Sequence, residues 1–276
     1  MRWIALMARE DRDLAVAAAH EMGKLLTTAG IKTFDPRSEK APSKCRMVIT
    51  FGGDGTLLAG AKYALKYDCP LLGIHMGTVG FLTEGSPIQM QKIADIVINE
   101  TWELEPRRLL QVRIDGRAEE WLALNDAVVT RGGFARLIQV ETRVNMEHWG
   151  TFIADGVIAA TPTGSTGYSL SAGGPVVAPG VECMVITPVC AHSLQHCPCV
   201  VPREAEIRFH LRAEREQRAE LQIDGQSMSD LQAGDTVIIT GAERVLWVVR
   251  VDKYHFFQLL QTKLNEWMKP GEEGNS

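Results

Sequence analysis

Phe51-Gly52-Gly53-Asp54-Gly55-Thr56 is the stretch on which the predicted fold depends. The apolar run Met47–Thr50 precedes it and predicts a buried strand, and Leu57–Leu65 follows it with apolar residues at helical spacing. A strand that turns through glycines into a helix leaves backbone N–H groups pointing at whatever lies above the strand end. The stretch therefore predicts an anion site.

Asp54 stands inside this predicted anion site. A helix cap would explain a carboxylate here, but it would not explain three surrounding glycines, which allow positive φ or close approach of a ligand. A carboxylate repels phosphate, so its presence indicates a group that receives a proton or lies near a bound cation. We expect Asp54 to be functional, with Gly52, Gly53 and Thr56 at a phosphate.

The composition describes an ordinary globular protein. The 276 residues, 45% hydrophobic and 23% charged, suffice for one large or two medium domains. The net charge of −5 offers no basic surface, so we expect neither nucleic acid nor a membrane as a partner. The apolar run in Met1–Glu10 is too short for a signal peptide and no stretch approaches a membrane span, which predicts a cytoplasmic protein.

The six cysteines are expected to be reduced thiols in such a protein. Cysteine and histidine side chains gather in the segment Cys190–Cys199, which offers four or five soft ligands. Their spacing matches no standard zinc pattern, and the setting is apolar and strand-like. We therefore predict no metal site in this segment.

Residues 1–100 are predicted to form an α/β domain with Rossmann-like parallel layers. Strands are expected at Trp3–Ala8, Ile31–Phe34, Met47–Thr50 and Pro70–Ile74, and helices at Leu14–Thr28, Leu57–Leu65 and Ile88–Ile98. Asp11 or Asp13 is expected to cap the first helix.

Residues 101–254 are predicted to form a mostly β domain. Asp115-Gly116 predicts a hairpin between Gln111–Ile114 and Trp121–Leu124, and Gly132-Gly133 predicts a second between Val128–Thr130 and Leu137–Val140. Further strands are expected at Val157–Ala160, Met184–Thr187, Cys199–Val201, Ile207–Leu211, Leu221–Ile223, Val237–Thr240 and Leu246–Val251. In residues 255–276, His255–Met268 predicts a helix that returns to the first domain.

A second glycine-rich turn, His75–Glu84, follows the strand Pro70–Ile74. Open α/β sheets bind ligands at the carboxyl ends of their strands. His75, at the start of this turn, would then lie beside the ligand; an ordinary loop histidine is an equally good interpretation.

Asp155–Pro175 is the longest unusual stretch: a strand is expected to end at Pro162, and the residues after it supply glycine, hydroxyl groups and one tyrosine. Hydroxyls and closely approaching amides suit ribose and phosphate oxygens, and an aromatic ring suits a base. A plain small-residue loop is the alternative for any short part of it. Its length favours a ligand cleft shared with the first domain.

Asn125-Asp126 interrupts an apolar run. Asn125 can read an adenine edge and Asp126 can accept from a hydroxyl, although a simple strand end would also explain the pair. No Walker-type loop is present, so phosphates would be held by amides, hydroxyls, a metal and scattered cations. Arg136 is one candidate cation, unless it is a solvated surface side chain.

Together these motifs resemble the NAD kinase family over nearly the whole chain. They are Gly52–Thr56, Gly80–Thr83, Asn125-Asp126, Asp155-Gly156, Thr161–Pro175 and Asp224-Gly225-Gln226. The first motif also occurs in diacylglycerol and sphingosine kinases, whereas Thr161–Pro175 is specific.

The resemblance implies transfer of the γ-phosphate of ATP to the adenosine-ribose 2′-hydroxyl of NAD, with Mg²⁺ as cofactor and Asp54 as proton acceptor. It implies a homodimer or homotetramer with NAD and ATP as substrates. The residues expected at NAD are Gly55, His75, Phe81, Asn125, Asp126, Arg136, Asp155, Thr163, Thr166, Gly167, Tyr168, Ser169, Leu170, Ser171 and Gln226.

The chain departs from the family pattern at several positions. Gly167 stands where many members have alanine, and Ile153 where many bacterial members have a basic residue, which leaves the choice between NAD and NADH open. Cys197 replaces a common arginine. A lipid kinase sharing the first motif, or a non-catalytic NAD sensor needing only Thr163–Ser171, are the alternatives.

Overall fold

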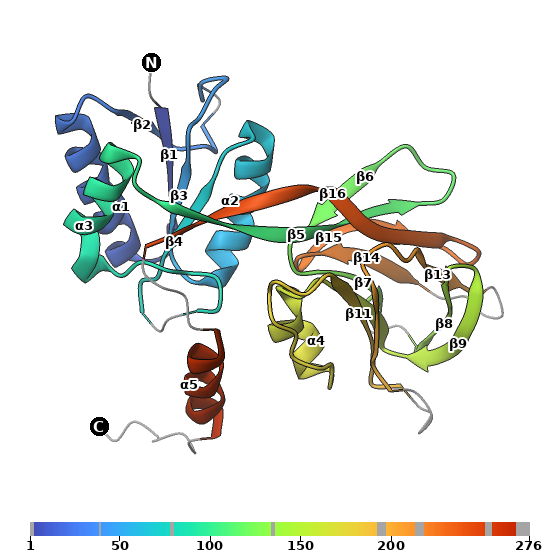
Figure 1. The fold of residues 1–276 in the computed structure, drawn as a ribbon. Helices are drawn as coiled ribbons and strands as arrows, with labels where there is room; N and C mark the ends of the chain where they lie inside the picture. Colours follow the sequence, from blue (N-terminus) through green and yellow to red (C-terminus); the bar gives the residue numbers. More distant parts are fainter. Residues whose placement is uncertain are drawn as a thin grey trace. The chain divides into compact units, whose positions relative to one another are not determined.

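The computed structural model describes residues 3–38, 40–77, 80–133, 136–191, 197–212, 218–251 and 256–268. The chain divides into two compact units (Figure 1). One comprises residues 1–105 together with 247–276, and the other comprises residues 106–246. The chain therefore returns to the first unit at Trp247, ahead of the boundary at residue 254 expected from the sequence.

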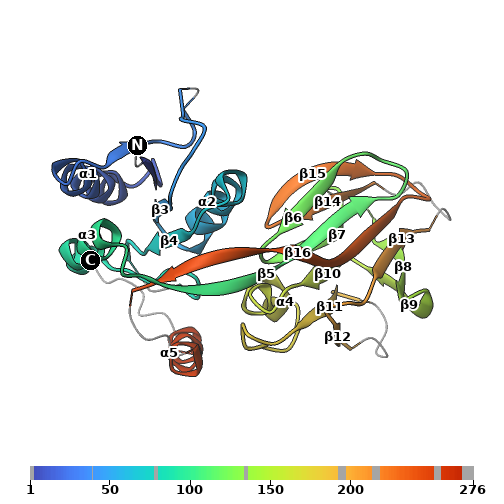
Figure 2. The ribbon, with the colours of Figure 1, turned by 45° about the horizontal axis from the view of Figure 1, so that its top comes forward.

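The first unit is a parallel sheet with helices on both faces (Figures 1 and 2). The strands lie in the order β2 (Lys32–Phe34), β1 (Trp3–Ala8), β3 (Val48–Phe51) and β4 (Leu71–Ile74). Helices α1 (Asp13–Thr28) and α3 (Met90–Asn99) cover one face, and α2 (Asp54–Tyr67) covers the other. The end of β16 (Thr236–Arg250) extends the sheet by pairing Val248 in parallel with Leu71.

The local patterns account for these elements. β3 and β4 are buried throughout, as expected of central strands in a parallel sheet. The core of the unit joins α1, β3, β4 and α3 through Met22, Ile49, Ile74 and Ile93, among others. The predicted cap of α1 is wrong: the N-cap residue is Arg12, without a side-chain cap, and the carboxylate of Asp11 pairs instead with Arg9 at 2.7 Å.

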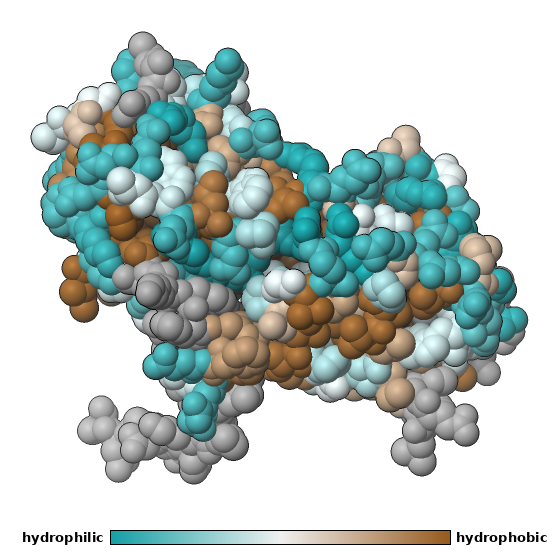
Figure 3. Space-filling view, viewed as in Figure 1, coloured by the Kyte–Doolittle hydropathy of each residue, from teal (hydrophilic) through white to brown (hydrophobic). Residues whose placement is uncertain are grey.

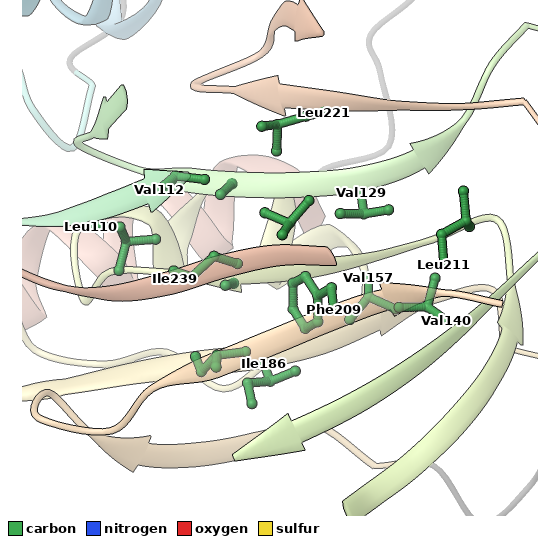
Figure 4. Packing of buried hydrophobic residues seen from close by; sticks show 14 of the residues in the cluster. Leu110, Val112, Val129, Val140, Val157, Ile186, Phe209, Leu211, Leu221 and Ile239 are labelled. Atoms are coloured by element: carbon green, nitrogen blue, oxygen red, sulfur yellow. The ribbon is translucent and has the colours of Figure 1, made fainter. Parts of the chain in front are cut away.

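The second unit is built from two largely antiparallel sheets. One sheet has the order β12 (Cys199–Pro202), β11 (Cys183–Val189), β10 (Gly156–Ala160), β7 (Asp126–Arg131), β14 (Ala219–Ile223), β15 (Gln226–Leu231). The other contains β16, β13 (Ile207–Leu211), β8 (Ile138–Val144), β9 (Glu147–Ala154), β5 (Glu103–Ile114) and β6 (Glu120–Ala123). Apolar side chains of both sheets, including Val112, Val157, Ile186 and Phe209, point toward one another and form the core (Figure 4).

The hairpin predicted at Asp115-Gly116 is confirmed, because β5 and β6 pair antiparallel. The hairpin predicted at Gly132-Gly133 is wrong. β7 already has β10 along one edge and β14 along the other, so no edge remains for β8, which pairs with β9 and β13 in the other sheet.

Three further differences concern the strands. The two predicted strands Val237–Thr240 and Leu246–Val251 form the single strand β16, and β9 and β15 were not predicted. The short helix α4 (Tyr168–Ser171) lies inside the hydroxyl-rich stretch, and α5 (Phe256–Met268) belongs to the first unit.

Hydrophilic side chains predominate on the face of the first unit seen in Figure 3, with hydrophobic ones in small groups between them. Among the described helices, none has the length and hydropathy that a membrane span requires.

Candidate active site

The first glycine-rich turn joins β3 to α2. Gly52 is buried, and a Cβ there would lie 2.1 Å from Thr56 Oγ1, so the turn requires glycine at this position. Gly53 is the N-cap of α2, and its carbonyl accepts from the amides of Thr56 and Leu57. At Gly53 and Gly55 a Cβ would meet nothing within 4 Å, so the helix start is open to a ligand.

The second glycine-rich turn holds the carboxylate of Asp54, the first residue of α2. Phe81 N–H donates to Asp54 Oδ2 at 2.9 Å, and Leu82 N–H donates to Oδ1 at 3.2 Å. Gly80 lies so close that a Cβ would stand 1.9 Å from Asp54 Oδ1. The two turns predicted from the sequence therefore meet at this carboxylate. It remains partly exposed, oriented by two amides and able to accept a proton.

His75 also belongs to this turn. Its amide donates to Gly85 O at 2.9 Å, and its Nδ1 lies 2.8 Å from Gly77 O. The imidazole ring thus contacts its own loop. This contact is compatible both with an ordinary loop histidine and with a histidine that contacts the ligand. Phe81 contributes its amide to the site, while its side chain is 9% exposed.

A small cavity of about 220 Å³ lies against the first turn. Its lining includes Gly52, Gly53 and two arginines, Arg9 and Arg12. The sequence analysis did not select these arginines. Arg9 directly follows β1 and Arg12 lies three residues later, so the carboxyl end of a neighbouring parallel strand was the signal that could have indicated them.

In the second unit, Asn125 directly precedes β7, and Asp126 is the first residue of that strand. The carboxylate of Asp224 accepts from the amides of Leu124, Asn125 and Asp126, at 2.9, 2.7 and 3.1 Å. Among the residues that the structure describes, none bonds the buried Oδ1 of Asn125. The backbone of Asn125 is thus fixed, and its side-chain oxygen Oδ1 is available to accept a hydrogen bond from a ligand.

Asp126 is 5% exposed. Burial, followed by the nearby charge of Asp224, raises the pKa of Asp126 to about 7. Near neutral pH the Asp126 carboxyl is therefore partly protonated, so it can donate a hydrogen bond as well as accept one.

The hydroxyl-rich stretch packs on the turn at Asn125. Thr161 Oγ1 donates to Leu124 O at 2.6 Å, and Thr161 N–H donates to Asn125 O at 2.8 Å. At Gly164 a Cβ would lie 2.0 Å from Asn125 O, so this close approach also requires glycine. The residues predicted to bind the base and ribose therefore lie together in this unit.

The predicted contacts within the stretch divide by exposure. Ser169 is fully buried, with its hydroxyl 2.8 Å from that of Thr187, and Thr163 is 5% exposed. Tyr168 is 44% exposed and Ser171 is exposed. The partly exposed residues are Thr166, Gly167 and Leu170. The buried hydroxyls therefore hold the loop in shape, and the exposed ones are available to a ligand.

A cavity of about 640 Å³ in the second unit is lined by Asp155, Arg131, Tyr168, Ser171 and Cys190, among others. Arg131 Nε lies 2.6 Å from Asp155 Oδ1, so the charge of this carboxylate is offset by a cation that the sequence analysis did not select. Burial raises the pKa of the Tyr168 hydroxyl, and the nearby ionisable groups of Cys190, Asp155 and Asp126 raise it further.

Two further predicted contacts belong to this unit, and one of them, Gln226, lies two residues after Asp224 and pairs with Ile223. Arg136 is exposed, and Gln226 is the exposed first residue of β15. His192 and His196 of the cysteine-containing segment lie outside the described residues. Within the described part of the chain, no group of three or more histidine, cysteine, aspartate or glutamate side chains could hold a metal ion.

Comparisons with family models and with individual proteins all match this chain to NAD kinases. Residues 6–102 match the family model of the ATP-NAD kinase N-terminal domain, and residues 124–251 match that of the ATP-NAD kinase C-terminal domain. The NAD kinase of Geobacter sp. (strain M21) is 34% identical, covering 96% of this chain and 98% of that protein. The NAD kinase of Gemmatimonas aurantiaca is 40% identical over 83% of this chain and 80% of its own length.

Solved structures are also similar. Yeast NADH kinase, solved in complex with NADH, has a TM-score of 0.84, covering 100% of this chain and 90% of its own, and its 22% identity supports the fold alone. An NAD kinase from Archaeoglobus fulgidus, solved in complex with ATP, has a TM-score of 0.74 at 27% identity, covering 95% of this chain and 98% of its own.

Proposed function

The chain belongs to the ATP-NAD kinase family and is an ATP-dependent NAD kinase, and from this premise we propose that Asp54 is its proton acceptor. In this reaction the 2′-oxygen of the adenosine ribose forms a bond to the γ-phosphorus of ATP. The bond from that phosphorus to the bridging oxygen breaks, and ADP leaves. The hydroxyl proton passes to the Asp54 carboxylate.

The observation that carries this proposal is the pair of amide bonds to Asp54 from Phe81 and Leu82. One amide on each oxygen fixes the plane of the carboxylate, so its remaining lone pairs have a defined direction. Phosphoryl transfer has a loose transition state in which alignment and charge neutralisation matter more than base strength. A single, rigidly oriented carboxylate suits that requirement.

We propose that the triphosphate lies at the open start of α2, against Gly52, Gly53 and Thr56. The support is the exposed backbone there and the neighbouring cavity that Arg9 and Arg12 line. Helix N-termini and arginines both favour phosphate.

Mg²⁺ is proposed as the cofactor that accompanies ATP and neutralises phosphate charge. It is typically bound through substrate phosphates and only one or two carboxylates, so the lack of a three-ligand cluster in the described residues fits it. Removing divalent cations with EDTA should abolish NADP formation, and Mg²⁺ should restore it.

NAD is proposed to contact the second unit, with the free acceptor Oδ1 of Asn125 receiving the adenine amino group. Asp126 would bond ribose hydroxyls, and the exposed face of Thr166–Ser171 would wrap the adenosine. Asp155 would face the nicotinamide side, and Gln226 would add a contact from β15. The role of Gly55, at the helix start, is contact with the dinucleotide.

Replacing Asp54 by asparagine tests the proposal. Asp54→Asn should abolish NADP formation while NAD binding, measured by calorimetry, is retained. Asp95→Asn removes an exposed carboxylate from α3 of the same unit and should leave turnover unchanged. Near-wild-type turnover of Asp54→Asn would contradict the role. Supplying a diacylglycerol in place of NAD should give no product, which separates this function from the lipid-kinase alternative.

A homodimer or homotetramer in the cytoplasm is the further proposal, and it comes from the family resemblance. Light scattering of the purified protein should give two or four times the chain mass; a monomer that is fully active would contradict it.

A further inference from the structure

A buried ion cluster holds the turn that orients Asp54. Glu84 follows that turn, and its Oε1 accepts from Nη1 of Arg250, the last residue of β16. Nε of the same arginine donates to Oε2 of Glu105. The side chains of Arg250 and Glu84 are only 5% and 8% exposed, and that of Glu105 is 25% exposed. One buried guanidinium thus bridges a buried carboxylate and a partly exposed one.

The backbone beside this cluster leaves the turn little freedom. The amides of Glu84 and Gly85 both donate to Gly73 O of β4, at 2.9 and 3.1 Å. A Cβ at Gly73 would lie 3.2 Å from Thr83 Cα, so strand and turn are in close contact. The hydroxyl of Thr83 accepts from Gly80 N–H at 3.1 Å. The turn is therefore fixed along its length, from the ion cluster to the amides that hold Asp54.

We propose that Arg250 is a positioning residue for Asp54, acting through Glu84 and the turn Gly80–Thr83. The inference rests on the proposed role of Asp54 in catalysis. A buried arginine that bridges two carboxylates fixes their geometry, and removing it leaves the buried charge of Glu84 without this cation. The turn would then relax, and the amides of Phe81 and Leu82 would no longer hold Asp54 in the plane required for transfer.

Kinetics of substituted enzymes test this inference. Arg250→Met should lower kcat about 100-fold, the size expected for a catalytic group misplaced by about 1 Å. The KM values for NAD and ATP should stay within about twofold, because neither substrate site is altered. Arg250→Lys keeps the charge without the fork and should recover only part of kcat.

The matched control is the ion pair between Arg46 and Glu100 in the same unit. It is a surface pair, with side chains 44% and 34% exposed. Arg46→Met should leave kcat unchanged. All variants are assayed well below their melting temperatures, with the folded fraction taken from circular dichroism. A loss of kcat that follows only the folded fraction would overturn the inference.

A double-mutant cycle tests whether Arg250 acts through Glu84. In the Glu84→Gln background, Arg250→Met should lower kcat much less than it does in the wild-type protein, because the link is already weakened. Independent effects, with fold-changes that multiply, would overturn the proposed route.

Hydrogen exchange gives a readout that does not depend on catalysis. The amides of Phe81 and Leu82 should exchange faster in Arg250→Met than in the wild type, and at the wild-type rate in Arg46→Met. Unchanged exchange at both amides would overturn the inference whatever Asp54 does. Retained turnover in Asp54→Asn would instead overturn the proposed function alone, which keeps the two failures distinct.

Discussion

Gly80→Ala is the substitution whose effect the geometry defines most directly. A Cβ at residue 80 would lie 1.9 Å from Asp54 Oδ1 and 2.4 Å from its Cγ. Ordinary contact begins near 3.4 Å, so the carboxylate and the turn must separate by about 1.5 Å. Because Asp54 is the first residue of the packed helix α2, we expect its side chain to rotate away and lose the hydrogen bonds from Phe81 and Leu82.

The size of the effect follows from the required alignment. A misplacement of about 1 Å can cost roughly 100-fold in rate, which corresponds to about 2.7 kcal/mol of activation free energy. We therefore expect kcat to fall about 100-fold or more in Gly80→Ala, with NAD affinity little changed.

The assay follows NADP through an NADP-specific dehydrogenase at saturating NAD and ATP, and calorimetry measures NAD binding. Gly180→Ala is the matched control, because a Cβ there would meet nothing within 4 Å. If Gly80→Ala turns over within about threefold of the wild type while folded, the alignment argument is refuted. An equal loss in Gly180→Ala would refute it too.

Three further substitutions test the second unit. Ser169→Ala should destabilise the protein by about 1–3 kcal/mol, because the hydroxyl of Thr187 loses its buried partner. The KM for NAD should stay unchanged. A rise in this KM would instead make Ser169 a ligand contact. The pKa of Asp126, about 7 against an ordinary 3.8, means that its contribution to stability is present below about pH 4 and lost as the pH rises through 7. Asp126→Asn should flatten that fall in melting temperature without ligand, and an unchanged slope would count against it. Arg131→Gln removes the cation that lies 2.6 Å from the carboxylate of Asp155. If the nicotinamide ring lies there, the KM for NAD should fall relative to the KM for NADH. An unchanged ratio of these two KM values would place the ring elsewhere.

The local sequence pattern was enough to predict those features that a single contiguous segment forms. The residues of β3, the glycine turn and α2 are contiguous, and their periodicity and glycines identified the strand, the turn and the helix start. The same holds for the hairpin of β5 and β6, whose Asp115-Gly116 turn fixes the pairing locally.

Pairing over long separations could not be predicted in this way. β7 and β8 are neighbours in sequence, but β7 is occupied by β10 and β14, and glycines between two strands do not reveal that. The carboxylate of Asp224 reaches amides about 100 residues away, and Arg250 meets Glu84 across 166 residues. Such contacts depend on the completed sheets, so the supports of Asp54 and Asn125 emerged only from the structure.

The interrupted course of the first unit has a consequence for biosynthesis. The ribosome makes residues 1–105 before residues 106–246, yet the end of β16, which pairs Val248 with Leu71, is made only after both. The second unit can therefore complete its sheets on the nascent chain while the first still lacks its closing strand. A premature stop before Trp247 would release a chain without Val248 or Arg250. The unit that is translated first is thus the last to be finished.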